Sequence, residues 1–428
     1  MIIGILIVLI FVVMAALMMM KKIPALLALP VMAVLISIAV GLPATGEEGI
    51  FTFVLDNGST RLAGTYVAIL FSCWLSQLLN RTGVTNTLIK KAAELGGDRP
   101  LIIALLLLIV TFIMFTTLYG TGAVAMVGAV VLPILLSIGI PAEIAANSFL
   151  MAMTGGYVLN PANISLITNI TGVDAQVINP AAVILAVLSL LFMLVYLIYG
   201  FKKSGIRLAM SVDTKKASDQ QLHGFRGFMA CMTPIAVIFM TLVFKLPALP
   251  VFMVGLVWAV VFTYKGTWAQ NVNLLVKSCY EGFRDGAPTA TLMFGIGMII
   301  NAVTAPTTQA VINPFMKAIT PTTPLGLIIF ICALSPFALY RGPFNLQGLG
   351  AGLAASMLAI NVVPVAALSA VFYAAFRWPT QACPTSTQVV WTANYVGMDP
   401  VSLTNKTQLA NWIVTIISVV ILTFIYFK

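Results

Sequence analysis

Apolar runs of about twenty residues recur along the whole sequence, and each is long enough to cross a bilayer core of about 30 Å. Of the 428 residues, 61% are apolar and only 8% are charged, whereas the surface of a soluble protein of this size needs far more charge. The sequence therefore predicts an all-α polytopic membrane protein. Its formal net charge of +10 does not indicate nucleic-acid binding, because the basic residues stand in the short connections between apolar runs.

The predicted spans fall into two sets on either side of one charged connection, which covers 202–226. The first set lies near 1–20, 23–43, 63–81, 100–118, 122–139, 142–158 and 178–201. The second lies near 227–245, 247–264, 286–303, 322–340, 346–361, 363–378 and 407–427. The opening run has no basic leading segment and is followed by Lys21-Lys22, so we expect a retained helix rather than a signal peptide.

The distribution of basic residues predicts the orientation. With the N-terminus outside, 16 of the 22 basic residues fall in cytoplasmic connections and four fall outside. The positive-inside rule therefore favours this topology, with the linker 202–226 in the cytoplasm. We expect the protein to reside in a bacterial inner membrane.

The two halves, 1–201 and 227–428, look like a duplicated unit. Each has an odd number of crossings, so the second half begins on the opposite side of the membrane, as in inverted repeats. Short matches keep their order, for example Pro161 with Pro384 and Asp174 with Asp399. We expect a hairpin at 100–139 and a broken helix at 142–172 in the first repeat. The second repeat should have a hairpin at 322–361 and a broken helix at 363–399.

Polar, Gly and Pro residues interrupt the apolar runs in four places: 116–122, 154–165, 335–347 and 377–388. Irregular backbone at membrane depth is tolerated where it lines a cavity or binds something. Such breaks expose helix N-termini, which attract anions, and helix C-termini, which attract cations. The alternative is that these Gly and Pro residues only permit close helix packing. Four breaks in matching positions favour a binding role.

Two arginines, Arg341 and Arg377, lie in the third and fourth breaks. A guanidinium at membrane depth needs a counter-charge or a wet cavity, and all twelve acidic residues are expected in connections or near helix ends. The missing counter-charge is most simply a substrate carboxylate, which Arg can bind with two parallel hydrogen bonds. Alternatively, these arginines snorkel to an interface or cap carbonyls. Asp174 and Asp399 are expected to cap helices rather than relay protons.

The breaks also resemble those of the ion transporter superfamily, which includes citrate–metal–proton symporters, gluconate permeases and divalent-anion–sodium symporters. In that group a re-entrant hairpin tip with a short polar motif leads into an apolar helix. Here Tyr119-Gly120-Thr121-Gly122 leads into AVAMVGAVVLPILL, and Gly155-Gly156 precedes Asn160-Pro161-Ala162-Asn163. Neither tip carries the frequent Ser-Asn-Thr motif, since the second reads Arg341-Gly342-Pro343-Phe344-Asn345. The resemblance implies a homodimer that works as an elevator, with Thr121, Asn163, Asn345 and Ser386 near bound cation or carboxylate.

These observations predict a cation-coupled symporter of a small carboxylate. The candidate substrate-binding residues are Tyr119, Gly120, Thr121, Gly122, Asn160, Asn163, Arg341, Gly342, Asn345, Arg377, Thr385 and Ser386. The candidate sodium ligands are Thr121, Asn163, Ser165, Asn345, Ser386 and Thr387. Sodium is favoured over a proton, because the predicted spans offer no carboxylate to titrate. A substrate that carries the proton itself stays open.

Other classes fit less well. A cation–proton antiporter of the same superfamily needs carboxylates in mid-membrane, and none is predicted there. A membrane-embedded enzyme needs a catalytic constellation, whereas the single histidine, His223, stands in the linker. A transporter of another anion and a passive channel remain open. We expect no cofactor besides a bound sodium ion, and as partners a small organic anion, a coupling cation, the lipid bilayer and a second copy of the chain.

Overall fold

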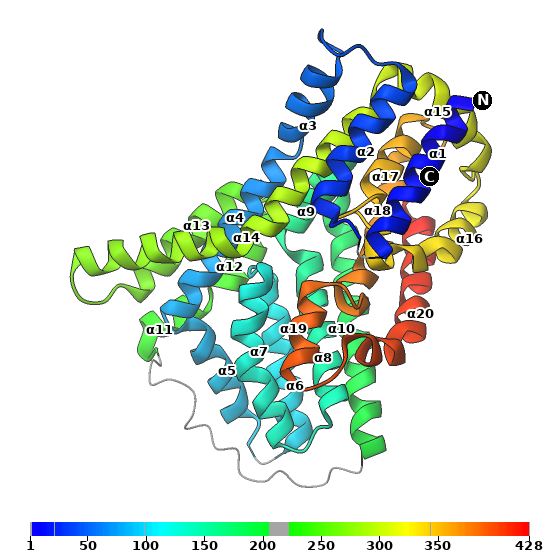
Figure 1. The fold of residues 1–428 in the computed structure, drawn as a ribbon. Helices are drawn as coiled ribbons and strands as arrows, with labels where there is room; N and C mark the ends of the chain where they lie inside the picture. The colour runs from blue at the N-terminus through cyan, green and yellow to red at the C-terminus, as the bar shows by residue number, and fades with distance from the viewer. Residues whose placement is uncertain (1, 21, 98, 205–221, 343, 428) are drawn as a thin grey trace.

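The computed structural model describes residues 2–20, 22–97, 99–204, 222–342 and 344–427, and all their secondary structure is helical (Figure 1). Within these ranges five helices are long and apolar enough to cross a membrane, or up to seven if each of two bent pairs counts as one span. Several shorter apolar helices accompany them. The chain is therefore a multi-pass membrane protein, as predicted. Most of the predicted linker, 205–221, lies outside the described residues.

The first half begins with two helices and a long composite span. Its elements are α1 (Ile2–Met19), α2 (Ala25–Val40), η1 (Ile50–Asp56), α3 (Asn57–Thr60), α4 (Ala63–Arg81), α5 (Val84–Leu95), α6 (Pro100–Phe115), α7 (Gly120–Ser137), α8 (Ala142–Leu159), α9 (Pro161–Thr171) and α10 (Ala175–Ser204). From η1 to α4 the chain runs as one span of 32 residues.

The second half follows the predicted linker. Its elements are α11 (Gly224–Cys231), α12 (Thr233–Leu242), α13 (Ala248–Thr263), α14 (Trp268–Thr304), α15 (Pro306–Ile319), α16 (Pro324–Leu334), η3 (Ser335–Arg341), α17 (Gly350–Ala359), α18 (Val365–Ala382), α19 (Thr387–Tyr395) and α20 (Pro400–Tyr426).

The order of elements is similar in the two halves. A long helix (α4 or α14) precedes a short one (α5 or α15), then a helix pair, then a helix interrupted near its end, then a long final helix (α10 or α20). We call α6–α7 the first hairpin and α16–η3–α17 the second hairpin. The interrupted helices α8–α9 and α18–α19 are the first and second broken helices. An inverted relation between the halves and an elevator movement stay predictions.

The long helices α4 and α14 pack along each other, and small residues let their backbones approach (Figure 1). A Cβ at Gly282 of α14 would lie 2.6 Å from the backbone nitrogen of Trp74 on α4. Arg81 and Glu281 form an ion pair across the two helices, in which Arg81 Nε lies 2.8 Å from Glu281 Oε2. These contacts fix the α4–α14 pair as a framework beside the hairpins.

One predicted span was too short. The span expected at 286–303 belongs to α14, which begins at Trp268, where Thr267 and Gln270 form a capping box. Glu281 and Asp285 therefore lie within a helix that is long and apolar enough to cross a membrane, not in a connection. The charged residues around them suggested a loop, but both carboxylates have partners on α4: Arg81 for Glu281 and Gln77 for Asp285.

The first arm of the second hairpin also differs from its prediction at 322–340. The α-helix α16 ends at Leu334 and continues as a short 3₁₀ turn, because Pro336 has no N–H with which to extend the α-helical ladder. Tyr340, with φ of 55°, then leaves the helical conformation. The expected caps are confirmed: Asp174 accepts from Gln176 N and Asp399 accepts from Ser402 N.

Candidate functional site

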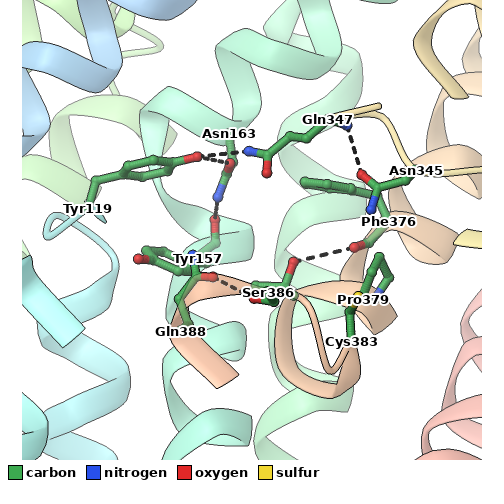
Figure 2. Close-up of a pocket in the computed structure, with 11 residues that line it drawn as sticks. Tyr119, Tyr157, Asn163, Asn345, Gln347, Phe376, Pro379, Cys383, Ser386 and Gln388 are labelled. Atoms are coloured by element: carbon green, nitrogen blue, oxygen red, sulfur yellow. Dashed lines mark hydrogen bonds between the residues drawn. The ribbon is translucent and has the colours of Figure 1, made fainter. Parts of the chain in front are cut away.

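The breaks of both halves meet at a small polar cavity, which we call the central pocket (Figure 2). Its volume is about 30 Å³, room for a water molecule or two. The lining residues are Tyr119, Tyr157, Asn163, Asn345, Gln347, Phe376, Pro379, Thr380, Cys383, Ser386 and Gln388. They come from the tips of both hairpins and from both broken helices.

The first broken helix turns at Asn160, whose extended backbone separates α8 from α9. Pro161 follows and cannot donate an N–H to α8, so a new helix begins there. Asn160 caps that helix, since its Oδ1 accepts from Ala162 N at 3.0 Å. Its Nδ2 donates to the carbonyls of Phe115 and Leu118, at 3.3 and 3.2 Å. Asn160 thereby ties the first broken helix to the tip of the first hairpin.

Three side chains from three elements form one hydrogen-bond chain across the pocket (Figure 2). Gln347 Nε2 donates to the Tyr119 hydroxyl at 3.0 Å, and that hydroxyl lies 3.4 Å from Asn163 Oδ1. Asn163 is held in turn, because its Nδ2 donates to the carbonyl of Tyr157 at 2.7 Å. This row of hydrogen bonds links both hairpins to the first broken helix.

The second hairpin tip is shaped by Asn345. Its Nδ2 donates to the carbonyl of Ala338 at 3.0 Å, and its Oδ1 accepts from Gln347 N at 2.9 Å. The side chain thus plays the role of a backbone turn, as Asx residues commonly do. It places Gln347 over the pocket.

The second broken helix contributes hydroxyls and an amide. Ser386 Oγ and Thr387 Oγ1 both donate to Gln388 Oε1, at 2.5 and 3.2 Å. Thr121 Oγ1, from the first hairpin, lies 3.1 Å from Thr387 Oγ1. A row of hydroxyls therefore runs from the first hairpin tip to the pocket wall.

The electrostatics at the surface of the pocket come from backbone rather than from charged lining side chains. None of the described residues that line it is charged. Three helices begin at its edge: Tyr119 is the N-cap of α7, Asn163 lies in the first turn of α9, and Ser386 is the N-cap of α19. Helix N-termini carry unpaired amides and partial positive charge. The arrangement can hold a small anion.

The predicted site residues divide into groups. Tyr119, Asn163, Asn345 and Ser386 line the central pocket. Gly120 and Gly122 lie at the start of α7 against Asp285. Thr121 and Thr387 face each other, and Gly342 accepts from Asn345 N through its carbonyl.

Other predicted residues lie away from the pocket. Thr385 lines a separate cavity of about 540 Å³, together with Tyr340, Pro384 and Pro288. Ser165 faces α4 and borders another cavity, of about 460 Å³. The side chain of Arg341 lies outside the described part of the structure.

Arg377 is a residue of α18 and is buried, with 1% of its surface exposed. It points toward α20, where its Nη2 lies 3.5 Å from Thr415 Oγ1, and its Nε and Nη1 have no partner among the described residues. It does not line the pocket, although Thr380, one turn along the helix, does. The guanidinium thus places a positive charge behind the pocket wall.

Several pocket residues were not predicted. Tyr157, Gln347, Cys383 and Gln388 line the cavity, and all four stand within the predicted breaks. Their polarity inside an interrupted apolar run was the available signal. Asp285 beside the first hairpin tip was missed because its helix was taken for a connection.

Broken helices whose ends meet at a polar pocket inside a multi-pass membrane protein are typical of transporters. Among solved structures the fold is similar to that of MtrF of Neisseria gonorrhoeae, described as illuminating a class of antimetabolite efflux pumps. The TM-score is 0.55 over 88% of this chain and 84% of that chain, at 14% sequence identity. No known family and no curated protein matches the sequence. The likeness shows that the two chains share a fold.

Proposed function

We propose that the chain is a secondary transporter that carries a small carboxylate across the inner membrane together with a cation. The observation that carries this proposal is the meeting of three helix N-termini at a pocket whose described lining has no charged side chain. Asp285 lies against the start of α7, whereas no acid lines the pocket beside the starts of α9 and α19, and such positive helix ends favour an anion. The amides and hydroxyls of Asn163, Gln347 and Ser386 then orient it.

A carboxylate suits this lining better than a larger inorganic anion. It is planar and accepts hydrogen bonds through two oxygens, and the Gln347 amide and the first-turn amides of α19 can donate such bonds from different sides. Arg377 adds positive potential from behind the wall without a contact in this state. Hydroxyls such as those of Tyr119 and Thr380 suit a hydroxy acid.

The coupling cation needs oxygen ligands near the anion. Thr121 and Thr387 offer hydroxyls at the first hairpin tip, and Asn163, Asn345 and Ser386 offer oxygens within the pocket. Such hard oxygens suit sodium. A proton is the alternative coupling ion, and the position of Asp285 beside the first hairpin favours it.

Transport requires the pocket to open, because about 30 Å³ is too small for a dicarboxylate. The turn 383–386 separates the pocket from the cavity of about 540 Å³, and Tyr340 N holds that turn by donating to Cys383 Sγ at 3.2 Å. Parting of the hairpin tips from the broken helices would join the two spaces. The elevator movement implied by the resemblance is a separate step, in which the hairpins and the broken helices of each copy in a homodimer carry the substrate together past a fixed scaffold.

The direction of transport has a second candidate. MtrF is described as an efflux pump, so export of an anion in exchange for a cation is the alternative to symport. The same pocket would serve both.

The proposal is tested by transport into liposomes that hold the purified chain. Labelled citrate, succinate, gluconate and lactate are offered under an imposed sodium or proton gradient of either direction. Saturable movement of one acid that follows one gradient supports the proposal, and the gradient's direction separates symport from exchange. Absence of movement of every acid under all gradients, in protein that melts cooperatively, would contradict it.

A further inference from the structure

One acidic residue inside a membrane helix touches the first hairpin. Asp285 lies near the middle of α14, and its Oδ2 accepts from Gln77 Nε2 of α4 at 2.5 Å. A Cβ at Gly122 would overlap this carboxylate, so the carboxylate rests directly on the first turn of α7. A side chain at this position would displace the carboxylate. The carboxylate therefore faces the positive end of α7.

The surroundings leave the helix end as the main positive partner of Asp285. On its own helix, Glu281 is paired with Arg81 of α4, and Arg284 is exposed. From α4, the neighbouring groups are Gln77 and the thiol of Cys73. From the hairpin, the Tyr119 hydroxyl points into the central pocket instead. Neither of the two ion pairs found among the described residues includes Asp285.

The rest of the tip is held on the same framework by weaker contacts. Ser72 Oγ of α4 donates to the carbonyl of Thr117 at 2.5 Å, and Cys73 Sγ lies 3.4 Å from the carbonyl of Tyr119. These neutral contacts do not titrate with the carboxylate. The contact made by Asp285 is the one whose strength depends on a charge.

We propose that Asp285 binds the coupling proton and that its charge holds the first hairpin tip against α4 and α14. In the ionised form the carboxylate attracts the α7 N-terminus. When a proton binds Oδ1 or Oδ2, the neutral acid loses that attraction and the tip is released. When the tip returns to α4 and α14 later in the transport cycle, the Asp285 carboxylate releases its proton to water. The proposal rests on the transport function proposed above and identifies its cation.

This residue is not fully enclosed by the chain. Asp285 is partly exposed, and Pro288, one turn along α14, lines the cavity of about 540 Å³. The preference for sodium depended on the expectation that no carboxylate lies within a span. Because α14 contains Asp285, that expectation does not hold, and a proton becomes the favoured ion.

A test independent of substrate uses hydrogen–deuterium exchange on the full chain in lipid nanodiscs, at low and at neutral pH and corrected for intrinsic rates. In wild type we expect the segment 116–127 to exchange faster at low pH, by between about twofold and thirtyfold, the range for a charge at a helix N-terminus. In Asp285→Asn the same segment should exchange fast at both pH values. Glu281→Gln, on the same face of α14, should behave like wild type. Equal protection in wild type and Asp285→Asn at both pH values would overturn the proposal.

A second test uses transport with a pH-sensitive dye inside the liposomes. Wild type and Glu281→Gln should move protons with the substrate, whereas Asp285→Asn should exchange labelled for unlabelled substrate but lose accumulation driven by a proton gradient. Accumulation that persists in Asp285→Asn would overturn the proposal, as would loss of exchange in protein of unchanged melting temperature.

If Asp285→Asn fails to fold, Asp285→Glu should keep coupling with a shifted pH profile, and an unshifted profile would count against the proposal. Failure of wild type to move any carboxylate would instead defeat the proposed function, and the exchange measurement would still decide the role of Asp285.

Discussion

Thr121 Oγ1 lies 3.1 Å from Thr387 Oγ1, so the tip of the first hairpin touches the start of α19 across 266 residues of sequence. Thr387 also donates to Gln388, which lines the central pocket. The contact therefore joins the two halves of the chain directly beside the site.

Loss of either hydroxyl in this contact should slow transport. We expect Thr121→Val and Thr387→Val each to lower uptake about 2- to 10-fold, the value of one hydrogen bond. Because both changes remove the same bond, the double variant should be no slower than the slower single one. Thr121→Ser, which keeps the hydroxyl, is the control. Additive losses would show that the two residues act separately.

Gly122→Ala should displace the first hairpin tip, because the added Cβ overlaps the Asp285 carboxylate. We expect a loss of about 1–3 kcal/mol in stability from the overpacked contact, measured by thermal unfolding in detergent. The matched control is Gly4→Ala, whose Cβ would meet Val311 only at 3.7 Å. Adding Asp285→Ala to Gly122→Ala should restore the melting temperature, and failure to do so would place the strain elsewhere.

Asn160→Ala should loosen the first broken helix from the first hairpin. It removes the cap on Ala162 N and both donors to the carbonyls of Phe115 and Leu118. Because the site is buried, we expect about 1–3 kcal/mol of destabilisation. Asn160→Asp keeps the cap but loses the donors, so it should fall between wild type and Asn160→Ala. An unchanged melting temperature in Asn160→Ala would contradict this role.

The charge of Arg377 should matter more than its shape. Since the guanidinium points to Thr415 and not into the pocket, it acts on a bound anion through space. Arg377→Lys should therefore keep the KM of the carboxylate within about twofold, whereas Arg377→Gln should raise it about 5- to 10-fold, a loss near 1 kcal/mol. If Arg377→Lys raised KM as much as Arg377→Gln, the planar guanidinium would contact the substrate in another conformation.

The membrane class and the positions of the breaks could be predicted from the sequence, because apolar length and Pro or Asn at membrane depth act locally. The caps at Asp174 and Asp399 were predictable for the same reason. The direction of Arg377 was not, since the sequence gives the depth of a side chain but not which neighbour its helix face meets. Asp285 was missed because its hydrogen-bond partner on α4, Gln77, lies 208 residues away in the sequence.

The candidate site shows the same division. Polar residues inside the breaks, such as Asn163 and Ser386, could be predicted as pocket residues. Ser165 could not be separated from them, because only the packing of α9 against α4 turns it to the opposite side.

The most direct test of the central claim compares Asn163→Ala and Ser386→Ala with Ser165→Ala in carboxylate uptake. Asn163 and Ser386 line the central pocket, whereas Ser165 lies on the same broken helix as Asn163 but on its other side. We expect Asn163→Ala and Ser386→Ala each to raise KM at least about tenfold, as loss of a hydrogen bond to a charged group predicts, and Ser165→Ala to match wild type. An equal rise of KM in all three variants, or a rise in Ser165→Ala alone, would contradict the assignment of the transported anion to this pocket.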